Sequence, residues 1–147
     1  MDTLAANLTL WSAVLAWAVA QLGKQLTHVA VTRRVDFRLF ISAGGMPSTH
    51  SATVSALAAS VALREGFGSA LFAVTAVLAL LVMFDAQSVR RAAGIQARLL
   101  NQIVDELFRE HRLAQTKLVE LLGHTPLEVL AGLLIGVFCA LIVHSRF

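Results

Sequence analysis

Apolar residues in this chain are gathered into long blocks that short polar stretches separate. Four of these blocks approach or reach the length that a helix needs to cross the hydrocarbon core of a bilayer, roughly 17 to 25 residues. They are Leu8–Leu26, Ser48–Leu63, Gly68–Phe84 and Pro126–Val143. The pattern therefore predicts about four transmembrane helices.

A different pattern occupies the segment Asp85–Glu110, after the third block. Apolar side chains recur there at helical spacing, while charged and amide residues fill the other positions. The apolar stripe consists of Leu99, Leu100, Ile103, Val104 and Leu107. We predict an amphipathic helix at the membrane surface rather than a fifth span. Arg109–Thr116 is then a loop, and Lys117–Leu122 leads back to the membrane.

The composition agrees with a membrane protein. Of the 147 residues, 57% are hydrophobic and 14% are charged, whereas about a quarter are charged in a typical soluble domain. We expect an all-α integral membrane helical bundle that forms a single domain over residues 1–147. Ala18–Ala20 resembles a signal-peptide cleavage site, but no basic residue precedes it, so the first block is interpreted as a retained span. Cys139 lies in the last block and is expected to be buried.

Positive charge is concentrated on one predicted side of the membrane. If the spans alternate, Gln25–Pro47 and Asp85–Thr125 share that side, and ten of the twelve Lys and Arg residues lie on or beside it. The positive-inside rule makes it cytoplasmic and puts both termini on the opposite side. These basic residues flank the predicted membrane spans, so we expect contact with anionic lipid headgroups and not with nucleic acid.

The first candidate for chemistry is the stretch LLGHTPLEV, where the last apolar block begins. Pro126 suits a first helical turn, and Glu128 lies one turn after His124 on the same face. A carboxylate at that spacing can fix the tautomer of the imidazole and leave its other nitrogen free as a nucleophile or base. The alternative is structural, because Thr125 and Glu128 also have the spacing of a capping box.

The second candidate is GGMPSTHSA, where the second block begins. Gly44 and Gly45 permit backbone conformations that other residues avoid, and Ser48 or Thr49 can cap the helix. Free amides at a helix N-terminus favour an anion, and His50 would lie beside it. By itself this stretch is more often a helix cap than a site.

Taken together, PSTH and GHTPLEVLAGLLIG resemble the second and third signature motifs of the type 2 phosphatidic acid phosphatase and vanadium haloperoxidase superfamily. With FDAQSVRRAAGIQARLLN, they look like its divergent, four-span branch, from Lys24 to about Gly136. The resemblance implies phosphoryl transfer without a metal. It implies that His124 is the nucleophile, Glu128 its orienting carboxylate and His50 the general acid. Ser48 and the backbone at Thr49 would hold phosphate oxygens.

The chain departs from the superfamily pattern in its cations. It contains no Arg-Pro, and Lys117 and Leu118 stand where the third motif has Ser-Arg. Thr49 replaces a Gly of the pattern and Glu128 an Asp. The candidates to bind phosphate instead are Lys24, Arg38, Arg90 and Arg91. For Lys24 the alternative is snorkelling, and for the Arg pair it is anchoring at the membrane edge.

Asp85 and Gln96 lie three turns apart on one predicted helical face and are expected to support the site. Asp85 would orient an Arg or, less favoured, help to hold Mg²⁺. Because the resemblance implies phosphoryl transfer without a metal, we expect no cofactor.

Three functions are consistent with these residues. The first is hydrolysis of a phospholipid or polyprenyl phosphate. The second is binding or transport of an anionic lipid without turnover, which the missing cations favour. The third, metal-dependent hydrolysis by His50, His124, Asp85 and Glu128, is weaker because no HExxH pattern is present. Small residues along Ser51–Ser60 suit close helix contacts, either within one chain or in a homodimer.

Overall fold

The computed structural model describes residues 6–35, 45–107 and 123–146 of the chain. These residues form five helices and no strand. The helices are α1 (Leu8–Thr32), α2 (Thr49–Glu65), α3 (Ala70–Gln87), α4 (Val89–Leu107) and α5 (Pro126–Arg146). The predicted all-α fold is confirmed for the described residues. The segments predicted at Arg109–Thr116 and Lys117–Leu122 lie outside them.

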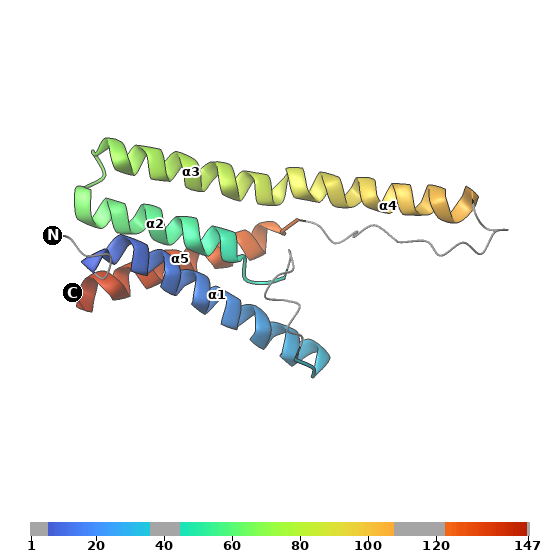
Figure 1. Ribbon diagram of the computed structural model, residues 1–147, viewed down its shortest axis with the longest axis horizontal. Helices are drawn as coiled ribbons and strands as arrows, with labels where there is room; N and C mark the ends of the chain where they lie inside the picture. Colours follow the sequence, from blue (N-terminus) through green and yellow to red (C-terminus); the bar gives the residue numbers. More distant parts are fainter. Residues whose placement is uncertain (1–5, 36–44, 108–122, 147) are drawn as a thin grey trace.

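Four of the helices coincide with the predicted spans, and polar side chains fix where they begin. The Ser48 side chain accepts a hydrogen bond from the Ser51 amide at the start of α2. Ser69 does the same for the Phe72 amide at the start of α3. Such caps satisfy amides that the helix itself leaves without a partner. At the other end of the bundle, α2 and α3 are joined by a short turn (Figure 1).

The interior of the bundle is built from small residues. Its core consists of Ala16, Ala20, Ala52, Ala56 and Cys139, so the predicted burial of the cysteine is confirmed. Large side chains point outward instead, and Leu71, Val74, Leu81 and Phe84 of α3 are all more than half exposed. A soluble protein rarely exposes so many large apolar side chains along one helix. Small residues inside and large apolar ones outside are the arrangement expected where lipid is the solvent.

Two glycines bring α5 against α2. A Cβ at Gly132 would overlap the Ser48 carbonyl and lie 2.9 Å from the Ser51 Cβ. A Cβ at Gly136 would lie 2.8 Å from the Ala56 amide nitrogen. This Gly-x-x-x-Gly spacing lets the two backbones approach closely. The small residues of α2 are therefore used at least partly within the monomer.

Helix α4 begins later than predicted. The sequence pattern assigns Asp85 to the amphipathic helix, but Asp85 belongs to the last turn of α3, which ends at the cap residue Ser88. Figure 1 shows α4 continuing roughly along the line of α3 and extending beyond the other helices. Among the described helices, α4 has extensive contact only with α3. The boundary is displaced because apolar and helical periodicity both continue through residues 84–88, so only the local cap marks the end of α3.

Two stretches of helix in the described part are long and apolar enough to cross a membrane. They are Ala70–Asp105, which combines α3 with most of α4, and Pro126–Arg146. Helix α2 has 17 residues, about 25 Å at 1.5 Å per residue against a hydrocarbon core of about 30 Å. In α1, Gln21, Lys24 and Gln25 interrupt the apolar sequence. The exact number of spans therefore stays a prediction.

Candidate active site

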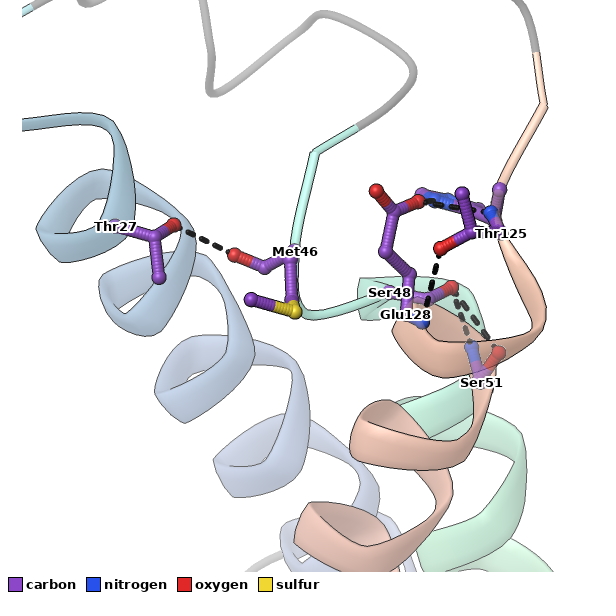
Figure 2. A network of polar contacts seen from close by, with 7 residues as sticks. Thr27, Met46, Ser48, Ser51, Thr125 and Glu128 are labelled. Atoms are coloured by element: carbon purple, nitrogen blue, oxygen red, sulfur yellow. Dashed lines mark hydrogen bonds and ion pairs between the residues drawn. The ribbon is translucent and has the colours of Figure 1, made fainter. Parts of the chain in front are cut away.

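The two stretches that the sequence singles out lie side by side. The Ser48 amide donates a hydrogen bond to the Glu128 carbonyl over 3.1 Å, which joins the start of α2 to the first turn of α5. Figure 2 shows the two helix starts with Ser48, Thr125 and Glu128 grouped between them. Both N-termini thus face one region with the positive ends of their dipoles, an arrangement that favours an anion.

His124 and Glu128 form a hydrogen-bonded pair at that point. The His124 Nδ1 lies 2.9 Å from the Glu128 Oε2, and the imidazole is almost wholly buried while the carboxylate is partly exposed. A carboxylate can only accept, so the neutral imidazole carries its proton on Nδ1 and has its lone pair on Nε2. The geometry predicted for an oriented nucleophile or base is present.

The structural alternative for Glu128 holds as well. The Thr125 amide donates to the Glu128 Oε2 over 3.1 Å, and the Glu128 amide donates to the Thr125 Oγ1 over 3.3 Å. This is a reciprocal capping box. One carboxylate oxygen therefore both closes the helix start and holds the imidazole, so the two interpretations do not exclude each other.

The C-terminal end of α3 fixes the backbone of His124. Its amide donates to the Ala86 carbonyl over 2.9 Å, and the preceding Gly123 has a φ of +100°, a conformation that glycine adopts without strain. Side-chain and backbone contacts thus come from different helices, and together they limit the movement of the imidazole.

His50 lies on the first turn of α2 and faces His124. The two ring centroids are 6.4 Å apart, with the rings tilted by 56°. His50 is exposed, so it can exchange protons with solvent. The two imidazoles are close enough to approach one phosphate group from different sides.

Ser48 performs the capping role that the sequence predicts. Its side chain is fully buried, and its Oγ accepts from the Ser51 amide over 3.4 Å and from the Ser51 hydroxyl over 3.0 Å. The Ser48 O–H proton is not used in either bond. Thr49 is the first residue of α2 and is partly exposed. Their contact with phosphate oxygens stays a prediction.

Lys24 is the predicted cation that the described structure brings to the site. It is 5% exposed, and its ammonium group interacts electrostatically with Glu128. Gly45, with a φ of +89°, packs so closely on Lys24 that an added Cβ would lie 3.1 Å from the Lys24 Cε. The Lys24 side chain therefore packs inside the bundle and does not snorkel to the surface. A buried ammonium needs a compensating charge, which Glu128 supplies.

The backbone before α2 is fastened to α1 beside Lys24. The Thr27 hydroxyl donates to the Met46 carbonyl over 2.7 Å, as Figure 2 shows. A Cβ at Gly23 would lie 3.2 Å from the Pro47 Cδ. The loop that carries Gly45 and Pro47 is therefore positioned by contacts with residues of α1, which lie outside the GGMPSTHSA stretch.

The remaining predicted residues are distributed differently. Asp85 is partly exposed on the last turn of α3, next to the Ala86 carbonyl that holds His124. Arg90 and Arg91 belong to the first turn of α4, but their side chains lie outside the described part, as does all of Arg38. Gln96 is exposed on α4. Because α4 has extensive contact only with α3, the structure does not bring Gln96 to His124.

Sequence reasoning missed three partners. Ser51, on the same helix, bonds the Ser48 hydroxyl. From other helices, the Ala86 carbonyl holds His124 and Gly132 allows α5 to touch Ser48. Only the glycine spacing left a signal in the sequence, at residues 132 and 136. Within the described residues, no three His, Cys, Asp or Glu side chains are grouped as metal ligands. The expectation that no cofactor is needed stays a prediction.

Comparison with known proteins covers nearly the whole chain. A family model described as "Divergent PAP2 family" matches residues 5–139. The chain is also similar to "Uncharacterized membrane protein YuiD" of Bacillus subtilis (strain 168), with 42% identity over an alignment 152 positions long. That alignment covers 96% of this chain and 96% of the relative. No solved structure matches the chain.

Proposed function

This membrane protein belongs to the divergent PAP2 family, and from that membership and the pairing of His124 with Glu128 we propose that it hydrolyses a lipid phosphate or pyrophosphate. In this proposal His124 is the nucleophile, Glu128 orients it and His50 is the general acid. The substrate is a phospholipid or polyprenyl phosphate that reaches the site from the cytoplasmic side of the membrane.

The observation that carries the proposal is the bond from His124 Nδ1 to Glu128 Oε2, 2.9 Å long. It holds the imidazole in the tautomer that a nucleophile needs, with the lone pair on Nε2. A capping box alone would require Thr125 and Glu128 but no histidine. The additional tie of the His124 amide to α3 supports a role that demands a fixed imidazole.

The proposed reaction has two steps. In the first, the His124 Nε2 attacks phosphorus, the bond from phosphorus to the lipid oxygen breaks, and His50 donates a proton to the departing oxygen. In the second, water attacks the phosphohistidine, His50 takes up the proton of that water, and inorganic phosphate leaves with His124 restored. Glu128 stabilises the charge that develops on the imidazole in both steps.

The surroundings suit an anionic head on an apolar body. Two helix N-termini and the Lys24 ammonium supply positive potential at the head. The outward faces of α3 and α5 carry large apolar side chains such as Leu81, Phe84 and Leu134. A phosphate bound at the start of α2 and α5 would therefore sit at one end of apolar helices, at the level expected for a lipid headgroup.

The test is phosphate release from purified protein in detergent micelles, measured with phosphatidic acid and with a polyprenyl phosphate. We expect release by the wild type and its loss in His124→Ala. His144→Ala is the matched control, since His144 lies at the opposite end of α5 and bonds Ser60. Release that His124→Ala leaves intact would overturn the proposed mechanism.

A second function is binding or transport of an anionic lipid without turnover. What favours it is that Lys24, the cation brought to the site, already interacts with Glu128, and that the Arg-Pro and Ser-Arg elements are missing. Tight binding of phosphatidic acid together with no phosphate release and no phosphohistidine in the wild type would decide for this function.

A further inference from the structure

An apolar groove runs between α3 and α5. It has a volume of about 790 Å³, and Leu80, Leu81 and Phe84 of α3 line it on one side. Leu130 and Leu133 of α5 line the other side. The volume is within the range of small-molecule sites, roughly 300 to 1,000 Å³. The groove exists because α3 packs mainly on α2 and has little direct contact with α5.

The groove continues along the bundle. A second hollow of about 450 Å³ lies between α2, α3 and α5 and reaches Phe67 and Phe72 at the turn between α2 and α3. The two hollows share Leu80, Met83 and Leu133 in their walls. Together they form an apolar path along much of the length of α3.

One end of this path opens at the candidate active site. Pro126 and Val129 line it there, and these residues directly follow Thr125 and Glu128 of the capping box. Gln87 lines it from α3, next to the Ala86 whose carbonyl holds the His124 amide. The groove therefore begins at residues adjacent in sequence to those of the polar site, an arrangement that suits a ligand with an anionic head and a hydrocarbon chain.

We propose that the groove between α3 and α5 binds the hydrocarbon chain of the lipid phosphate whose head lies at His124 and Lys24. This inference rests on the proposed substrate class but not on turnover. A bilayer lipid of any kind could enter an apolar groove. The distinctive consequence is that occupancy depends on the phosphate, because the groove begins at the first turn of α5, and the positive potential of the adjacent site attracts only an anionic head.

The direct test is photolabelling of the wild-type protein in vesicles of a neutral phospholipid. The probes are phosphatidic acid and diacylglycerol with the same photoreactive acyl chain, and adducts are mapped by mass spectrometry. We expect adducts at Leu80, Met83 and Leu133 with the phosphatidic acid probe, several-fold stronger than with the diacylglycerol probe. Unlabelled phosphatidic acid should suppress them.

Two outcomes would overturn the inference. One is equal labelling of the groove by both probes, which would make it a site for ordinary bilayer lipid. The other is labelling that occurs only on outward residues such as Leu134 and Phe138. Failure of the catalytic proposal would give another result. The phosphatidic acid probe would still label the groove more strongly than the diacylglycerol probe, but no phosphate would be released.

A matched pair of variants gives a second measure. Leu133→Trp fills the groove where its two parts meet, whereas Leu134→Trp adds the same ring to a position on the adjacent face that is 60% exposed. We expect Leu133→Trp to lower labelling at Leu80 and Met83, and binding of long-chain phosphatidic acid, by about tenfold. Binding of a short-chain analogue should change little. Equal effects of the two variants on long-chain binding would contradict the proposal.

Discussion

At the scale of single residues, Glu128 is the position where structural and chemical roles coincide. Its Oε2 accepts from both the Thr125 amide and the His124 ring. A capping box needs only an acceptor, whereas stabilising an imidazolium needs a negative charge. The two roles can therefore be separated by removing the charge and keeping the acceptor.

Glu128→Gln makes that separation. Its amide oxygen can still accept from Thr125, so we expect the melting temperature to stay close to that of the wild type. Turnover should fall by about two orders of magnitude because the developing charge on His124 loses its partner. Initial rates and thermal unfolding measure the two effects. Thr125→Ala is the reciprocal control and should cost about 1 kcal/mol of stability with a much smaller loss of rate. Unchanged turnover in Glu128→Gln would exclude the catalytic role of the carboxylate.

Lys24→Met tests the proposed phosphate cation, since it keeps the aliphatic chain that packs against Gly45 and removes the ammonium. We expect weaker affinity for phosphatidic acid by roughly tenfold or more, because a charge-assisted hydrogen bond contributes about 1.5 to 3 kcal/mol. Binding is measured by titration into micelles. Lys24→Arg should retain more of the affinity, and equal affinity in Lys24→Met and wild type would remove Lys24 from the site.

At the scale of helices, the site depends on how closely α2 and α5 approach. Ser48 and Glu128 are joined through backbone atoms, and this bond requires the contact that Gly132 and Gly136 permit. A larger residue at either glycine of this contact between α2 and α5, called the seam below, would separate the helix starts and move His124 away from His50.

Gly136→Ala tests the seam at a distance from the chemistry. The new methyl group would meet the backbone of α2 at Ala52 and Ala56, so we expect destabilisation of about 1 to 3 kcal/mol. Gly68→Ala is the matched control, because nothing lies within 4 Å of a Cβ there. Thermal unfolding in detergent measures both variants. If Gly136→Ala unfolds at the same temperature as Gly68→Ala, α2 and α5 do not pack as described.

At the scale of the whole molecule, the order of elements puts both helix starts at one end of the bundle. The ends of α1 and α3 lie at that same end, and the turn between α2 and α3 lies at the other (Figure 1). The distribution of Lys and Arg predicts that the end with the site is cytoplasmic.

This orientation can be measured by labelling single cysteines in intact cells with a reagent that does not cross membranes. Cys139 is buried and is replaced by Ala. We expect Glu65→Cys, at the end of α2, to be labelled in intact cells. Asp105→Cys, on α4, should react only after the cells are opened. The reverse result would invert the predicted topology.

The helices and the family could be predicted from the sequence because each leaves a local signal, and the convergence of the two motifs followed from the resemblance. Apolar blocks predict the four long helices, and Ser48 and Thr125 are recognisable caps. The predicted boundary between α3 and α4 was wrong because the residues on both sides of Ser88 have helical periodicity. The contacts of Gly132 and Gly136 with α2, and of His124 with the Ala86 carbonyl, depend on how the helices are rotated and packed. No local pattern encodes that packing.

If His124 is the nucleophile, its covalent intermediate can be trapped. Purified wild-type protein is incubated briefly with radiolabelled phosphatidic acid, denatured in alkali and digested. We expect an acid-labile, alkali-stable phosphate on the peptide that contains His124, and its absence from His124→Ala. Rapid phosphate release by the wild type without labelled protein, or an equal label in His124→Ala, would contradict this role of His124.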